Sequence, residues 1–321
     1  MPPRRRTGQK LLKALLPILL VLVLALAGLA AWLVYGASHP PQRAYLVTPE
    51  KFGQLSDRGL KATEETWSNR DGTSARGWLL RGTEGAPAVM LLHRYGADRS
   101  WLLNLGVKLN ETTNMTVLLP DLRGHGENSP IATSTFGARE TEDALAAVDY
   151  LRSLKTAQNR PLAGGPIGLY GVEMGAYAAL GAAHDNQVVQ SLVLDSAPDT
   201  PDDVLRAAVR GNTGFDNDLL QLLARGAARL YFFGGYRSTS GCLTAESMKD
   251  QHVLLLAGEG SGPLRASTET LSKCFPNPAN VESQTGLPLT GFTLAAASPE
   301  QGETYDRRVI EFFQRTLSAK R

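Results

Sequence analysis

The chain has 321 residues, 43% of them hydrophobic and 20% charged, which is enough apolar material for one large domain with a real core. Its formal net charge is +2, but five basic residues lie among the first thirteen, and without them 28 basic residues stand against 31 acidic ones. The rest of the chain is therefore mildly acidic, which excludes the basic surface typical of a nucleic-acid-binding protein.

The first predicted element is a transmembrane helix over residues 14–38, which contain no charged side chain. A bilayer needs about 20 apolar residues, whereas the apolar core of a cleaved signal peptide usually has about 7–15. Cleavage after Ala37 is also disfavoured, because Tyr35 would occupy a position that prefers a small residue. Trp32 and Tyr35 are typical of side chains at a membrane–water interface. A buried core helix remains the other alternative.

The basic tail, residues 1–13, predicts the orientation of this helix. The positive-inside rule places the tail in the cytoplasm and the main domain outside. We therefore expect a single-pass, signal-anchor membrane protein whose partner is the lipid bilayer and whose domain is extracytoplasmic. In such a compartment Cys242 and Cys274 could form a disulfide, and the alternative is two separate buried thiols.

Residues 39–62 contain consecutive prolines and are predicted to be an extended linker. The domain is expected over residues 63–321. A hairpin is predicted around the turn 70–74, after which strands and helices alternate. Strands are expected at 87–93, 115–121, 165–171, 188–196, 252–258 and, more weakly, 290–297, with helices at 101–111, 138–154, 175–183, 265–275 and 303–317.

This alternation predicts an α/β fold with a mostly parallel sheet covered by helices on both faces. The segment 199–250 between two strands is longer than a simple crossover and shows helical patterns at 201–209 and 217–230. We expect it to be a small helical lid over the ends of the strands.

Three motifs follow three of the predicted strands in order: "LLHRYGADRSW", "PDLRGHGENS" and "YGVEMGAYAAL". Together they resemble the α/β-hydrolase superfamily, especially the serine aminopeptidase and monoacylglycerol-lipase-like group, over residues 63–317. The second motif is similar to that group's Asp-x-Arg-Gly-x-Gly-x-Ser, with one extra residue before the serine. The matching residues are Asp121, Arg123, Gly124, Gly126 and Ser129.

The resemblance implies where a catalytic triad would lie, and the expected residues are missing. The nucleophile position, between two glycines, is Glu173 instead of serine, and the acid position is Ser261. The base histidine is expected between Gly291 and Ala297, where the sequence has none. In the first turn, the group's His-Gly is His93-Arg94. The pocket and oxyanion region would comprise His93, Arg94, Tyr95, Glu173 and Met174.

Two of these replacements predict a contact, because the strands before Arg94 and Glu173 are neighbours in the implied fold. We hypothesise that the two side chains form an ion pair that fills the former active site, since a buried carboxylate without a cation would be costly or protonated. The alternative is that both reach solvent independently. His93 and His125 are expected to orient loops, with replacement bases as the alternative, and Ser129, Ser191 and Ser196 are expected to be ordinary serines.

The sequence predicts no cofactor and no metal. The five histidines are scattered, and the Gly258–Gly262 stretch lacks the third glycine of a dinucleotide-binding loop. We expect a catalytically silent, membrane-anchored α/β-hydrolase-like pseudoenzyme that binds a small apolar ligand or a protein partner. The alternatives are a divergent hydrolase of esters or small acyl substrates that uses Glu173, and a structural or interaction module at the membrane surface.

Overall fold

The computed structural model describes residues 5–54, 62–184, 186–293 and 298–318. Its centre is an eight-stranded sheet with the order β1-β2-β4-β3-β5-β6-β7-β8. The hairpin of β1 and β2 is antiparallel, as is the β2–β4 pair, and all other neighbours are parallel. The strands are β1 Ala62–Ser68, β2 Ser74–Leu80, β3 Ala88–Leu92, β4 Thr116–Pro120, β5 Ile167–Val172, β6 Val189–Asp195, β7 His252–Gly258 and β8 Val281–Leu287.

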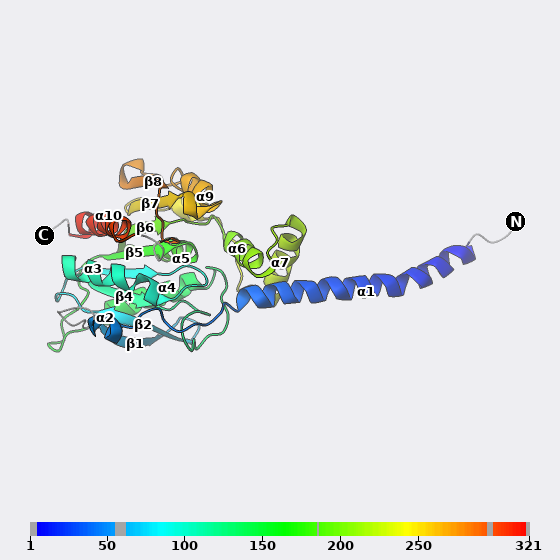
Figure 1. The fold of residues 1–321 in the computed structure, drawn as a ribbon, viewed down its shortest axis with the longest axis horizontal. Coiled ribbons are helices and arrows are strands. Elements are labelled where there is room, and N and C mark those ends of the chain that lie inside the picture. Colours follow the sequence, from blue (N-terminus) through cyan, green and yellow to red (C-terminus); the bar gives the residue numbers. More distant parts are fainter. Residues whose placement is uncertain (1–4, 55–61, 185, 294–297, 319–321) are drawn as a thin grey trace.

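Helices cover both faces of the sheet, as a parallel sheet requires (Figure 1). One face packs against α4 (Glu140–Ser153), α5 (Met174–Ala183) and α9 (Leu264–Leu271). The other packs against α3 (Leu103–Thr113) and α10 (Pro299–Leu317). The central strands β3, β4 and β5 are buried along their whole length, which explains their continuous apolar runs. The predicted α/β fold is confirmed.

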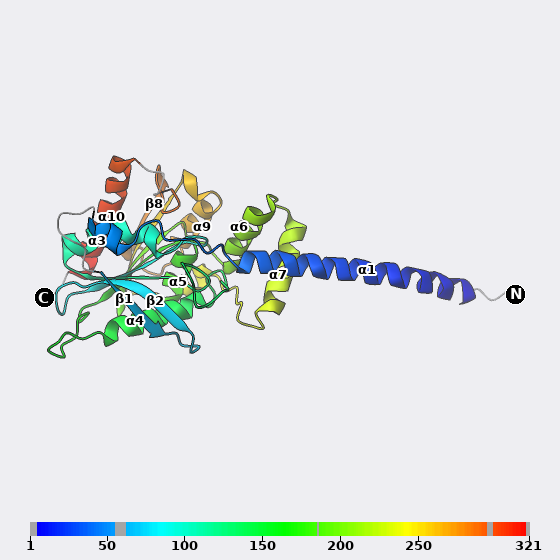
Figure 2. The same cartoon turned by 60° about the horizontal axis from the view of Figure 1, so that its bottom comes forward.

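The N-terminal helix α1 (Arg5–Ser38) projects away from the domain (Figures 1 and 2). Its segment Lys13–Ser38 is apolar and long enough for a membrane anchor or a signal sequence. Only its C-terminal end is buried in the domain, through Leu33, Val34 and Ala37. These residues pack in one cluster with side chains of the lid. The helix thus packs against the domain at its C-terminal end, and its residues 13–28 are exposed to solvent.

The segment after α1 differs from the predicted extended linker. It contains a short helix, α2 (Pro49–Gln54), and residues 55–61 lie outside the described part. The Tyr45 hydroxyl donates a hydrogen bond to Asp121 (2.6 Å), and its ring lies edge-on to Trp78. The sequence signal for a linker was proline, which prevents a continued helix but does not prevent packing against the domain.

The insertion between β6 and β7 is helical, as expected for the lid. It contains α6 (Pro201–Thr213), α7 (Asp218–Tyr231) and α8 (Gly241–Ala245). A disulfide joins Cys242 of α8 to Cys274, with 5.3 Å between their Cα atoms, so the open question of separate thiols is decided in favour of the bridge. Both views place α6 and α7 beside the domain-side end of α1 (Figures 1 and 2).

The last strand lies earlier in the chain than expected. A strand was predicted at 290–297, but residues 291–293 form a turn, and residues 294–297 lie outside the described part. The eighth strand is instead β8, which pairs with β7 at the edge of the sheet. Its sequence is mostly polar and its residues are exposed or half-buried. An edge strand of this kind lacks the apolar run by which the buried strands were found.

Candidate functional site

The candidate site lies where the parallel strands end, because their carboxyl ends meet at one edge of the sheet. Arg94 follows β3, Glu173 follows β5, Asp195 ends β6 and Ser261 follows β7. Since β5 pairs with both β3 and β6, Glu173 is placed between the ends of these two strands. The fourth expected element, a histidine near 291–297, is absent from the sequence.

Glu173 stands on a sharp turn between β5 and α5. Its backbone has φ 51° and ψ −113°, a conformation that non-glycine residues rarely adopt. The flanking glycines permit this turn, because a Cβ on Gly171 would lie 2.2 Å from the carbonyl oxygen of Gly175. A Cβ on Gly175 would lie 2.3 Å from the carbonyl oxygen of Leu92. The chain therefore keeps the backbone of a nucleophile elbow, although its side chain is a carboxylate.

The Glu173 carboxylate is buried and is held by a backbone amide. The N–H of Tyr95 donates to Oε2 across 3.0 Å. Burial raises the pKa of Glu173 from 4.5 to about 7, although Arg94 and the backbone amides of Tyr95 and Met174 each lower it. Tyr95 belongs to the first turn, and Met174 is the residue after the nucleophile position. These are the positions that the resemblance assigned to the oxyanion hole.

The expected ion pair between Arg94 and Glu173 does not form. Among the ion pairs of the described residues, none joins these two side chains, and Arg94 Nη1 donates instead to the carbonyl oxygen of Tyr95 (3.1 Å). The guanidinium lies 5.0 Å from the centre of the Trp101 ring and 5.4 Å from that of Phe292. The prediction of a contact was wrong, because aromatic faces hold the cation and the Tyr95 amide holds the carboxylate. The charges still interact: burial lowers the pKa of Arg94, and Glu173 offsets part of this effect.

His93 and His125 connect the loop after β3 with the loop after β4, and they orient both loops as the sequence predicted. Nε2 of His93 accepts from the N–H of Leu122, and Nε2 of His125 accepts from the N–H of Gly96, both across 3.0 Å. Each ring therefore carries its proton on Nδ1, which donates to a backbone carbonyl 2.8 Å away. Burial lowers the pKa of His93 to about 4 and that of His125 to about 3. Both rings stay neutral and are fully engaged, so neither is placed to serve as a base.

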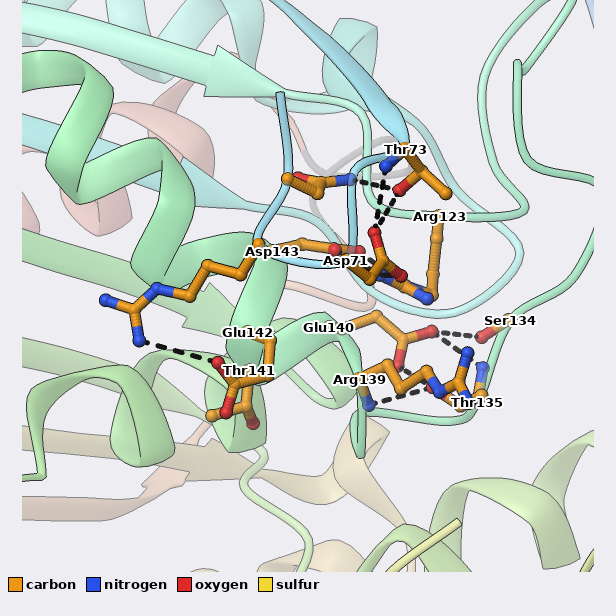
Figure 3. A network of polar contacts seen from close by, with 12 residues as sticks. Asp71, Thr73, Arg123, Ser134, Thr135, Arg139, Glu140, Thr141, Glu142 and Asp143 are labelled. Carbon is orange, nitrogen blue, oxygen red and sulfur yellow. Dashed lines mark hydrogen bonds and ion pairs between the residues drawn. The ribbon is translucent and has the colours of Figure 1, made fainter. Parts of the chain in front are cut away.

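The loop after β4 is further held in place by a buried ionic network (Figure 3). Nε of Arg123 donates to Asp143 (2.6 Å), and Nη2 lies 3.1 Å from Asp71. Glu140 accepts hydrogen bonds from the hydroxyls of Ser134 (2.7 Å) and Thr135 (2.6 Å). The arginine of the second motif is thus a structural residue. Ser129 is also structural, because its hydroxyl donates to the carbonyl oxygen of Ile131.

Sequence reasoning missed Asp195, a fully buried carboxylate at the end of β6. It accepts hydrogen bonds from the Ser196 hydroxyl (2.6 Å), the Gly291 N–H (2.7 Å) and the Tyr305 hydroxyl (2.5 Å). Burial raises its pKa to about 6. Ser196 in turn lies 2.7 Å from the hydroxyl of Ser261, the acid position. Ser196 is therefore a buried, hydrogen-bonded serine. For Asp195, the signal available in the sequence was an aspartate at the end of a buried apolar strand.

Ser191 was correctly expected to be an ordinary strand residue. Its hydroxyl hydrogen bonds that of Thr316 on α10, near the start of β6 and away from the turn that carries Glu173. His252 begins β7 and therefore lies at the opposite end of the strand from the site.

A cavity of about 430 Å³ opens above Glu173. The lid helix α6 forms one wall with Arg206, Ala207 and Arg210, and the loop after β7 forms another. Arg206 is paired with Asp216 (2.8 Å), so the charges of the lid wall are largely balanced. The full lining is Glu173, Asp203, Arg206, Ala207, Arg210, Asp216, Gly260, Ser261, Gly262, Pro263, Leu264, Ser267 and Phe292.

At the nucleophile position this arrangement differs from that of a serine hydrolase. The elbow presents a carboxylate, which is not an activated hydroxyl, and the described histidines near it are bound to loop backbone. The Tyr95 amide, at a position that the resemblance assigned to the oxyanion region, already bonds the Glu173 carboxylate. The site can hold a ligand in the cavity, and its carboxylate, with a pKa near neutrality, can exchange a proton with it.

Comparison with known proteins places this geometry in context. A family model described as "Alpha/beta hydrolase family" matches residues 72–253, which is more than half of the chain. The thiohydrolase aneE of Aspergillus aculeatus is 27% identical over 124 residues. That alignment covers 38% of this chain and 37% of the thiohydrolase, so this chain matches little more than a third of the relative's length.

Solved structures share the fold at low sequence identity. The esterase Pf2001 of Pyrococcus furiosus has a TM-score of 0.64 and 22% identity, covering 87% of this chain and 98% of its own. The α/β hydrolase GrgF of Penicillium sp. sh18 has a TM-score of 0.53 and 18% identity, covering 81% of this chain and 100% of its own. At such identities the likeness concerns the fold alone.

Proposed function

The chain belongs to the alpha/beta hydrolase family, and from this premise we propose that it is a membrane-anchored member that binds a small ligand under its lid without hydrolysing it as a serine hydrolase. One observation carries the proposal. The amide of Tyr95, at a position expected to stabilise an oxyanion, hydrogen bonds the carboxylate of Glu173 across 3.0 Å. A substrate carbonyl would have to displace a group of the protein before it could use this amide.

The cavity favours ligand binding over a purely structural role. A filled site would suit an interaction module, whereas about 430 Å³ of space remains between Glu173 and α6. Phe292 and Leu264 give this space apolar walls, and the Ser261 hydroxyl and the Glu173 carboxylate give it polar groups. Pockets that hold small organic molecules combine these two features.

Anchoring by α1 is part of the same proposal. The segment Lys13–Ser38 has the length and composition of a span, and the basic tail before it favours a cytoplasmic N-terminus. The Cys242–Cys274 disulfide supports a domain outside the cytoplasm, because disulfides persist in oxidising compartments.

A second candidate function is hydrolysis with Glu173 as the general base. The observation that favours it is the pKa of about 7, since a base works best when its pKa lies near the working pH. In this alternative the carboxylate would leave one of its amide donors and activate a water molecule in the cavity. The neighbouring esterase and thiohydrolase are the reason to test ester and thioester bonds.

The test uses the full chain in detergent micelles with p-nitrophenyl butyrate as the probe. We expect the ester to raise the melting temperature while no nitrophenol is released above background. Ala207→Trp, which fills the cavity wall, should abolish this rise. Glu173→Ser should remain inactive, because no histidine base accompanies it.

Other outcomes would decide between the functions. Turnover that disappears in Glu173→Gln would replace ligand binding by hydrolysis through Glu173. Neither turnover nor a shift in melting temperature, with this ester and with the matching butyryl thioester, would favour a structural module. A fluorophosphonate probe that labels the wild type would contradict the absence of a reactive serine.

A further inference from the structure

The lid helix α7 carries an apolar stripe on its exposed side. Its residues recur every three or four positions and therefore share one face of the helix and its C-terminal end. Leu230 is 76% exposed and Phe233 is 94% exposed, far more than is usual for such side chains. The exposed stripe consists of Leu219, Leu222, Gly226, Leu230 and Phe233.

The opposite side of α7 packs against other parts of the protein. Ala224 and Ala228 are buried in the cluster that contains Leu33 and Val34 of α1. The stripe is therefore not a core face that α1 covers. It is a second apolar face on the same helix, which the described residues leave open to solvent.

Phe233 adds an independent sign that this face is built to project outward. Its φ of 43° is positive, which is unusual for a bulky residue and is unfavourable without a compensating role. The conformation follows directly after α7 and holds the ring almost completely exposed. A positive φ after the C-cap ends the helix, and at Phe233 it is accompanied by an exposed ring.

The length of α1 places α7 relative to a bilayer. The part of α1 that is free of the domain runs from Ala14 to Gly28, after which Leu29 packs against the cluster that includes α7. About 15 residues rise only about 22 Å, whereas the hydrocarbon core is about 30 Å thick. A bilayer spanned by α1 therefore extends to about Trp32 and reaches the level at which α7 packs.

From these observations we infer that α7 is an interfacial helix that lies on the same bilayer that α1 spans, with its apolar stripe buried in the lipid surface. The inference rests on the proposed anchoring by α1. In both views α7 runs across α1 and not along it, which is how a helix lying in the membrane plane is oriented to a span (Figures 1 and 2).

Charge does not supply the attraction, so the lipid headgroup needs no particular sign. Asp218 and Arg229 lie near opposite ends of α7, and its third charged residue, Arg225, is paired with Asp202 (3.7 Å). Burial of apolar area is the driving force that remains. Neutral phosphatidylcholine is therefore the bilayer that tests the inference most directly.

The experiment places one fluorescent reporter at a time on the full chain in phosphatidylcholine vesicles. Both native cysteines are joined in the disulfide, so a single introduced cysteine can be labelled with a nitrobenzoxadiazole dye. The sites are Leu222→Cys and Phe233→Cys on the stripe and Leu20→Cys within α1. Gln314→Cys is the matched control, because it is exposed on α10 at the far end of the domain.

We expect lipids with a nitroxide near the headgroup to quench the dye at 222 and 233 at least about twofold more than at 314. Lipids with a deep nitroxide should quench the dye at 20. Adding Leu222→Glu should weaken quenching at 233 and leave quenching at 20 unchanged, because both altered residues are exposed and the fold does not depend on them.

Three results would overturn the inference, and they have different consequences for the anchor and for the stripe. If the dye at 20 is quenched but those at 222 and 233 behave like that at 314, α7 does not lie on the membrane although α1 spans it. If the dye at 20 is not quenched, both the proposed anchor and the interfacial helix are contradicted. A blue shift at 222 and 233 without quenching would assign the stripe to a second copy of the chain.

Discussion

The backbone N–H of Tyr95 donates a hydrogen bond to Oε2 of Glu173 across 3.0 Å. This contact joins the turn after β3 to the elbow after β5. Under the proposed function it would hold the Glu173 carboxylate where a hydrolase stabilises an oxyanion. Four predictions follow from the geometry around it and from the bridge that ties down the lid.

Glu173→Gln should change how stability depends on pH. The pKa of Glu173 is 4.5 when unperturbed and about 7 in the folded protein, so between these values the folded state binds a proton that the unfolded state has lost. Wild-type stability therefore falls as pH rises from about 4.5 to about 7, by at most about 3 kcal/mol. The glutamine stays neutral and avoids this loss.

Melting temperatures in detergent micelles at pH 5 and pH 8 check this prediction. The difference between Glu173→Gln and the wild type should be more favourable to the variant at pH 8. Glu111→Gln, on the exposed surface of α3, is the matched control and should show no such change. A difference for Glu173→Gln that is equal at both pH values would contradict a raised pKa.

Arg94→Met should make the buried carboxylate harder to ionise. The guanidinium lowers the pKa of Glu173 without touching it, and methionine can keep the packing between Trp101 and Phe292. At pH 8 the substitution should cost about 1 kcal/mol more in the wild type than in a Glu173→Gln background. Equal costs in the two backgrounds, measured by thermal unfolding, would show that the two charges do not interact.

Gly175→Ala should prevent the elbow from forming. The new Cβ would lie 2.3 Å from the carbonyl oxygen of Leu92 and 2.6 Å from that of His93, and backbone atoms cannot move aside. We expect a loss of about 3 kcal/mol or more, or failure to fold. Gly211→Ala in α6 is the control, because nothing lies within 4 Å of its Cβ, and it should stabilise by up to about 1 kcal/mol.

Removing the disulfide should loosen the lid. Cys242 and Cys274 are 32 residues apart in sequence, so their bridge restricts a sizeable loop of the unfolded chain. Replacing both by alanine should lower the free energy of unfolding by about 3–4 kcal/mol. Reduction of the wild type should reproduce most of this loss, and a melting temperature that does not respond to reductant would contradict the bridge.

Much of the fold could be predicted from local patterns in the chain. Continuous apolar runs marked the buried strands, and the turns at His93, Asp121 and Glu173 marked their order. β8 was not predicted, because its polar, half-exposed residues form a strand through pairing with β7 and show no strand periodicity of their own. The packing of the segment before the sheet was not predicted, because a proline-rich stretch gives no sign that Tyr45 contacts Trp78.

The sequence by itself determined which residues stand at the expected triad positions. A glutamate at the elbow and the absence of any histidine after His252 are facts of composition that no folding can change. Only the tertiary structure decided what surrounds these positions. The Tyr95 amide holds Glu173, aromatic rings hold Arg94, and α7 turns an apolar face outward beside α1. The physical reason is that hydrogen-bond geometry, burial and exposure depend on neighbours brought together from distant parts of the chain.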